Sequence, residues 1–166
     1  KGDTFGTDLS LSADGMRLAV GAGRNDDNGR NSGHVRIFEL KDKTWTQLGD
    51  DINGEKRNDV SGSAVALSRD GTTVAIGSKF ADDNHNQSGH VRIFKYTYNA
   101  GTDKWAWIRL GNQIPGSTQA ERFGWSVDLS SDGKTVAVGA PWRDREINGK
   151  TSPDHGRVVV YDLAGN

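Results

Sequence analysis

The sequence predicts an all-β fold built from a four-stranded antiparallel unit that recurs along the chain. At an offset of 56, residues 11–15 match 67–71 and residues 32–38 match 88–94, almost residue for residue. A third, more divergent copy begins at Phe123. Polar and apolar residues alternate with period two inside the copies, and no window has the i, i+3, i+4 apolar spacing of an amphipathic helix.

The sequence of the first copy predicts its four strands in order. Residues 8–12 alternate polar and apolar side chains, Asp14 and Gly15 supply a tight turn, and residues 17–20 resume with branched side chains, which predicts a β-hairpin. A polar stretch then leads into a third strand over residues 33–40. After a charged turn, residues 45–52 complete the unit as a fourth strand.

Four antiparallel strands recurring about every 55 to 60 residues are typical of one blade of a β-propeller. We therefore expect residues 1–166 to form a single β-propeller segment of about three blades, from repeats at approximately 1–58, 59–121 and 122–166. The expected strand counts are four, four and three, so the last blade lacks a strand. Unpaired faces predict further propeller blades as partners, either from the same longer chain or from another copy of it.

Composition excludes several classes of partner and chemistry. The 21 Lys and Arg residues against 22 Asp and Glu residues leave a net charge of −1, which argues against a nucleic-acid partner. No apolar run approaches the roughly 18 to 20 residues of a membrane span, so we expect no membrane insertion in this segment. The absence of cysteine excludes disulfides, thiolate nucleophiles and cysteine-based metal sites.

Short glycine motifs recur in register with the repeat. Phe5 and Gly6 are followed by Gly-Ala-Gly at 21–23, and Phe123 and Gly124 are followed by Gly-Ala-Pro at 139–141. This pattern resembles the FG-GAP repeats of integrin-α-type β-propellers. The second copy departs from it, with Ser-Gly at 61–62 and Gly-Ser-Lys at 77–79.

The resemblance implies an adhesion or ligand-binding module located outside the cell or at the cell surface. Repeats of this family often carry a calcium loop of D-x-D-x-D-G type between the two motifs. This chain has only short turns at 12–15, 68–71 and 131–133 instead, which puts that calcium site in doubt.

Another acidic cluster follows the second strand of the first two copies and offers a different place for calcium. Oxygen-rich loops can hold Ca²⁺, which takes six to eight hard ligands. The alternative is that these side chains bond to their own backbone in Asx turns. The candidate residues are Asp26, Asp27, Asn28, Asp82, Asp83 and Asn84.

Some histidine and tryptophan residues recur between the copies and others do not. His34 and His90 occupy the same repeat position, which predicts a shared structural role, and His90 with His85 lacks the further partners of a zinc site. Trp125 and Trp142 have no equivalent in the first copy, so they are the candidates for ligand binding. Trp45 and Trp107 are equivalent, which predicts core or inter-blade packing for both.

The repeat and its family resemblance favour a non-enzymatic interaction, adhesion or scaffold module that binds a protein or glycan ligand. The chain has no G-x-S-x-G elbow, P-loop or dinucleotide-binding fingerprint, and we assign no catalytic residue. A propeller enzyme acting on an extracellular polysaccharide is one alternative, and a structural subunit of a larger assembly is another. An Asn-Gln-Ser sequence makes Asn86 a candidate glycosylation site, and calcium is the candidate cofactor.

Overall fold

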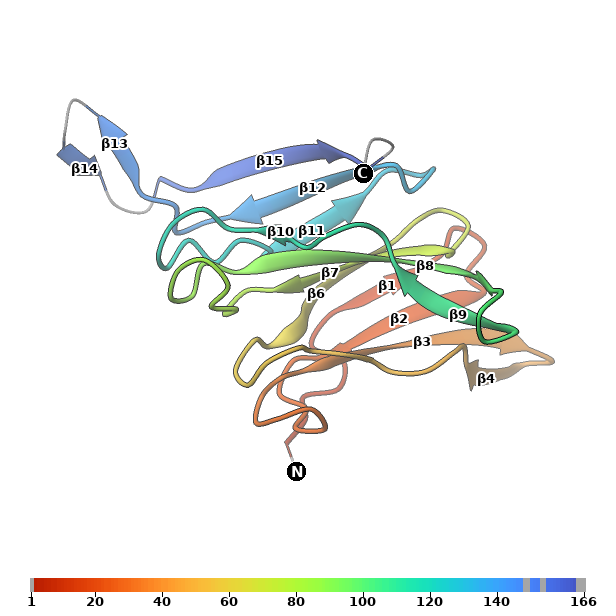
Figure 1. Ribbon diagram of the computed structural model, residues 1–166. Coiled ribbons are helices and arrows are strands. Elements are labelled where there is room, and N and C mark those ends of the chain that lie inside the picture. Colours follow the sequence, from red (N-terminus) through yellow and green to blue (C-terminus); the bar gives the residue numbers. More distant parts are fainter. Residues whose placement is uncertain (1, 148–149, 153–154, 164–166) are drawn as a thin grey trace.

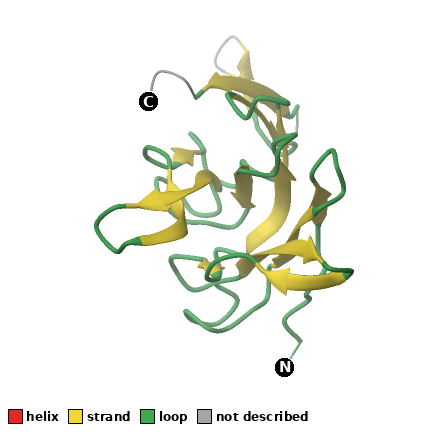
Figure 2. Ribbon diagram, turned by 90° about the vertical axis from the view of Figure 1, so that its right-hand side faces the viewer, coloured by secondary structure: helices red, strands yellow, loops and turns green. Residues whose placement is uncertain are grey.

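The computed structural model describes residues 2–147, 150–152 and 155–163. Over these residues the chain consists of strands, turns and loops without a helix (Figure 2). The described part accordingly contains no helix long and apolar enough to cross a membrane. The prediction of an all-β fold is confirmed.

The first blade is an antiparallel sheet of order β1-β2-β3-β4, with β5 also paired to β3 (Figure 1). Its bounds are β1 Leu9–Leu11, β2 Arg17–Ala22, β3 His34–Lys41, β4 Thr44–Gln47 and β5 Ile52–Asn53. The single fourth strand expected over 45–52 is therefore wrong, because it is split in two. Gly49 takes a φ of 79° between the two parts, and this left-handed conformation interrupts an extended strand.

The second blade repeats this plan as a sheet of order β10-β8-β7-β6, with β9 also paired to β8. Its bounds are β6 Ser61–Leu67, β7 Thr73–Ser78, β8 His90–Asn99, β9 Lys104–Arg109 and β10 Ile114–Pro115. The third blade is a three-stranded sheet of order β11-β12-β15. A separate hairpin of β13 and β14 projects away from it (Figure 1). Their bounds are β11 Ser126–Leu129, β12 Thr135–Ala140, β13 Arg145–Ile147, β14 Lys150–Ser152 and β15 Arg157–Asp162.

The three sheets lie side by side in chain order, and the termini lie at opposite ends of the stack (Figures 1 and 2). β6 packs against β1 and β2, and β11 packs against β6 and β7. The molecule is a segment of a β-propeller whose last blade lacks its fourth strand among the described residues, as the repeat predicts.

Two hydrophobic cores fill the spaces between successive blades, and the middle blade contributes to both. Period-two alternation places Val65 and Leu67 in one core and Ala66 in the other, because successive side chains on a strand point to opposite faces. The first core contains Ala19, Val35, Ile37, Ile52, Val65, Leu67, Val74, Ile76 and Phe94. The second contains Ala66, Ala75, Val91, Ile93, Phe123, Leu129, Val136, Val138 and Ala140.

The repeated glycine motifs mark where neighbouring blades touch through their backbones. A Cβ built on Gly21 would lie 2.0 Å from the Gly62 carbonyl oxygen, and a Cβ on Gly77 would lie 2.1 Å from that of Gly124. Gly62 and Gly124 also have φ of 85°, where a side chain is strained. The glycine of the Phe-Gly motif therefore packs on the first glycine of the Gly-Ala-Pro motif in the preceding blade. The second copy keeps both glycines and makes this contact with each of its neighbours, although its motifs are Ser-Gly and Gly-Ser-Lys.

The outer blades leave one face of their sheets uncovered. Leu9 and Leu11 of β1 are each 58% exposed, and Val158 and Val160 of β15 are 72% and 63% exposed. Phe123 is fully buried between blades, whereas its repeat equivalent Phe5 is 53% exposed. Each blade thus depends on a neighbour to cover its apolar face.

Candidate functional site

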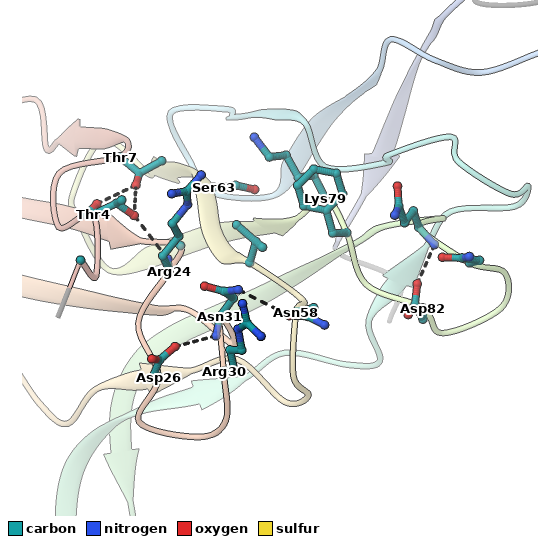
Figure 3. Close-up of a pocket in the computed structure, with 16 residues that line it drawn as sticks. Thr4, Thr7, Arg24, Asp26, Arg30, Asn31, Asn58, Ser63, Lys79 and Asp82 are labelled. Carbon is teal, nitrogen blue, oxygen red and sulfur yellow. Dashed lines mark hydrogen bonds between the residues drawn. The ribbon is translucent and has the colours of Figure 1, made fainter.

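A groove of about 1250 Å³ lies where the loops after β2 and β7 meet the segments that precede β1 and β6 (Figure 3). Hydroxyl and amide side chains contribute much of its lining, including Thr4, Thr7, Asn31, Asn58 and Asn86. These groups donate and accept hydrogen bonds, so the groove suits a polar ligand better than an apolar one.

Positive charges outnumber negative charges in the groove lining by one. Arg24, Arg30 and Lys79 line it. Two acids, Asp26 and Asp82, line it as well, and each accepts a backbone hydrogen bond within its own loop. The Asp26 carboxylate accepts from the Asn31 N–H at 2.7 Å. The Asp82 carboxylate accepts from the Gln87 N–H at 2.6 Å in the same way.

Lys79 and Phe80 of the groove lining belong to a larger group in which lysine and arginine alternate with aromatic rings. We call this group the cation–aromatic cluster; it consists of Lys79, Phe80, Arg122, Trp125 and Trp142. Lys79 Nζ lies 4.0 Å from the centroid of Trp125, and the Arg122 guanidinium lies 4.5 Å from that of Trp142. The two indoles meet edge to face with centroids 4.3 Å apart. Cations over ring faces are attracted by the ring quadrupole, so these contacts fix the orientation of both.

Burial together with the nearby Arg122 charge lowers the pKa of Lys79. Lys79 is half-buried against the indole of Trp125, which is itself 37% exposed. An ammonium group held in this way has lost part of its hydration shell, which strengthens its attraction for a bound anion.

The sequence comparison selected both indoles but missed their cationic partners. The structure brings Trp125 and Trp142 into contact, although 17 positions separate them in the chain. Lys79 and Phe80 stand where the first copy has Gly23 and Arg24, so they also break the repeat. The break of the repeat that marks the two indoles therefore marks Lys79 and Phe80 as well.

The six candidate calcium ligands do not all point to one place. Asp26 and Asp82 bond to backbone N–H groups five residues ahead, within their own loops. The side-chain amide nitrogens of Asn28 and Asn84 donate to the Gly54 and Gly116 carbonyl oxygens. Calcium binding at these loops stays a prediction.

Asp27 and Asp83 face the two histidines that share a repeat position. Asp83 hydrogen-bonds to His90 Nδ1, whereas the Asp27 carboxylate lies 3.5 Å from His34 Nδ1 without a hydrogen bond. Both histidines are buried at the start of equivalent strands, but only His90 is hydrogen-bonded, so their shared structural role stays a prediction. Asn86 is exposed on the lip of the groove, and its glycosylation stays a prediction.

The equivalent tryptophans Trp45 and Trp107 also differ. Trp107 packs against the first core, and its Nε1 donates to the Leu48 carbonyl oxygen at 2.8 Å, which joins blades one and two. Trp45 is 41% exposed. Inter-blade packing is thus confirmed for Trp107 and wrong for Trp45, because Trp107 packs against the blade that precedes its own, whereas no blade precedes the first among the described residues.

The comparison with family models agrees with the repeat. No curated protein matches the chain. The crystal structure of the tricorn protease is similar over 93% of this chain and 13% of that chain, with 9% sequence identity and a TM-score of 0.48. A model of the FG-GAP repeat matches residues 1–38 and 116–161, half of the chain in total. With its paired glycine motifs at the blade contacts, the chain belongs to the FG-GAP repeat family.

Proposed function

We propose that this chain is a non-enzymatic interaction module, working outside the cell or at its surface, that binds an anionic glycan in the groove. The observation that carries the proposal is the continuity of a polar, cationic groove with the cation–aromatic cluster. Guanidinium groups bind carboxylate and sulfate with paired, charge-assisted hydrogen bonds. An indole offers a large rigid face on which a sugar ring can stack.

A glycan suits the groove better than a protein segment because the lining is polar. Specific protein interfaces place apolar and aromatic anchors at their centre and keep polar groups at the rim. Here arginine, threonine and asparagine side chains line the groove, and the indoles lie outside this lining, with Trp125 in contact with the groove residue Lys79. An acidic peptide shares the charge of the proposed ligand, so it is the competing outcome of the test.

The test measures binding of the whole chain to four immobilised polymers: heparin, polygalacturonate, neutral dextran and poly-glutamate. We expect binding to one or both acidic glycans, weakening as salt rises because the contacts are ionic. Arg24→Gln with Arg30→Gln should weaken it roughly tenfold, as should Trp125→Ala. Lys104→Gln removes one positive charge from the exposed outer strand β9 and is the control for a charge outside the groove.

Equal binding to poly-glutamate and the glycans would mean that only charge is recognised, and the glycan proposal would fail. Preference for poly-glutamate would favour an acidic protein ligand. If Lys104→Gln reduced binding as much as the groove variants, the groove would not be the site.

A second role, as a structural unit within a larger propeller, is favoured by a different observation. The exposed apolar residues of β1 and β15 lie on the two outermost sheet faces, where another blade would pack in a longer array. We propose that further blades, from a longer chain or a second copy, cover these faces.

A further inference from the structure

His34 is a buried histidine whose ring nitrogens have no hydrogen-bond partner among the described residues. It begins β3 and is 2% exposed. Burying a polar group without a partner costs about 1 to 3 kcal/mol. Native structures therefore retain such a group rarely, and each case calls for an explanation such as a bound ion.

Two carboxylates converge on the same nitrogen of His34. Asp27 Oδ2 lies 3.5 Å from His34 Nδ1, and Asp51 Oδ2 lies 3.6 Å from it. The three ligand atoms all lie within 4.8 Å of one another. Ligands held at about 2.1 Å from a tetrahedral zinc ion are separated by about 3.4 Å, which is close to both nitrogen–oxygen distances.

We propose that Asp27, His34 and Asp51 bind one divalent transition-metal ion such as Zn²⁺. An imidazole nitrogen and two carboxylate oxygens suit zinc, whereas calcium prefers oxygen ligands alone. Three protein ligands leave a coordination position for water. This set of ligands differs from the loop residues considered for calcium and shares only Asp27 with them.

Neighbouring side chains hold Asp51 in position for this role. The Arg36 guanidinium donates to both carboxylate oxygens of Asp51 at 2.8 to 3.0 Å, and Gln47 Nε2 donates to Oδ1 at 2.7 Å. Hydrogen bonds from outside the coordination sphere commonly orient metal ligands in this way. The positive charge of Arg36 also repels a cation, so we expect weaker metal binding than at a site with the same ligands and no neighbouring positive charge.

The second blade provides an internal comparison, because the residues equivalent to His34 and Asp27 are already bonded to other side chains there. His90 there is bonded to Asp83, and Lys56 Nζ lies 2.9 Å from the other oxygen of Asp83. Gln113 stands at the repeat equivalent of Asp51. Without a second carboxylate and with a lysine in place, the second blade is unsuited to a cation, and the proposal predicts one ion per chain.

The experiment titrates Zn²⁺ into chelator-treated protein by calorimetry and records the visible spectrum after adding Co²⁺. We expect one ion per chain and a Co²⁺ spectrum showing nitrogen and oxygen ligands. Asp27→Asn and Asp51→Asn should each weaken Zn²⁺ binding roughly tenfold or more. The Asp27 side chain is 57% exposed, so its replacement should leave the fold intact, which thermal unfolding will verify.

Matched controls separate this site from chance binding elsewhere. Asp26→Asn changes the adjacent acid, and His85→Ala with His155→Ala removes two exposed histidines. Both controls should bind Zn²⁺ like the unmodified chain. The proposal is overturned if the unmodified chain takes up no ion, if Asp27→Asn binds normally, or if the histidine control abolishes binding.

Discussion

At the scale of single residues, two buried acids occupy equivalent repeat positions but differ in how far their surroundings stabilise the ionised carboxylate. Asp59 precedes the second blade and is 2% exposed, and Glu121 precedes the third blade and is fully buried. Asp59 accepts one hydrogen bond, from the Lys56 N–H. Glu121 accepts from the backbone and hydroxyl groups of Ser117 and Thr118 and lies 2.7 Å from Arg157.

Burial raises the pKa of Asp59 to about 6, so its ionised form destabilises the folded state. The folded state binds an extra proton between about pH 4 and pH 6, and the free energy of unfolding therefore falls as pH rises through that window. Asp59→Asn should raise the free energy of unfolding at pH 7 by about 1 to 3 kcal/mol and remove this slope. Urea unfolding at several pH values measures both, and an unchanged slope would contradict the assignment.

Glu121→Gln should have the opposite effect and destabilise the chain by about 2 to 4 kcal/mol at pH 7. The substitution removes a buried charge that four donors and Arg157 stabilise, and it leaves some of them unpaired. Urea unfolding followed by tryptophan fluorescence is the measurement. Lys41→Gln, which breaks the ion pair between Glu39 and the 68% exposed Lys41 side chain, is the control and should leave the free energy of unfolding nearly unchanged.

At the scale of elements, the glycine contacts between blades should tolerate no side chain. Gly124→Ala would place a Cβ 2.7 Å from the His90 carbonyl oxygen at a φ of 85°. Backbone strain and the clash together should cost about 3 kcal/mol or more. Gly101→Ala, in the turn after β8, would meet only the Asn99 side chain at 3.2 Å and is the control in thermal unfolding. Similar melting temperatures for both variants would refute this explanation of the motif.

The short turns that replace the calcium loop are held by their own side chains. Ser12 Oγ donates to Asp14 at 2.6 Å, and Ser130 Oγ donates to Asp132 at 2.7 Å. These serine hydrogen bonds are the main cause of the lowered pKa of each aspartate. The turn hydrogen bonds thus satisfy side chains that would serve as metal ligands in a longer loop.

At the scale of the whole molecule, the uncovered faces of β1 and β15 predict assembly. Burying large aliphatic side chains stabilises by about 1.5 to 3 kcal/mol each, so pairing such faces is favourable. Light scattering should give a multiple of the 18.0 kDa chain mass for the isolated chain. Leu9→Glu with Leu11→Glu should restore the single-chain mass, and a chain that is already monomeric would exclude self-assembly.

Much of the fold followed from the sequence because its signals are local. Alternation with period two predicted the faces of the strands, and each S-x-D-G turn closes through contacts within five residues. Repetition then predicted that blades pack against one another. The break between β4 and β5 was missed because it depends on the left-handed conformation of Gly49, which recurs at Gly111 between β9 and β10 and which an alternation of polar and apolar residues does not reveal.

The candidate sites followed from the sequence only in part. Comparing copies selected Trp125 and Trp142 but could not show that Lys79 lies over one indole and Arg122 over the other. Asp51 gave no signal of its own, because it reaches His34 from a segment 17 positions away.

The sequence by itself determined the number of blades, the first three strands of each blade and the turns that join the first two, since these depend on hydrogen bonds and side-chain faces within a few residues. Only the tertiary structure decided which unrepeated residues from different blades share a surface. The repeat cannot encode those contacts, because copies with similar backbones carry different side chains at the positions where the loops meet.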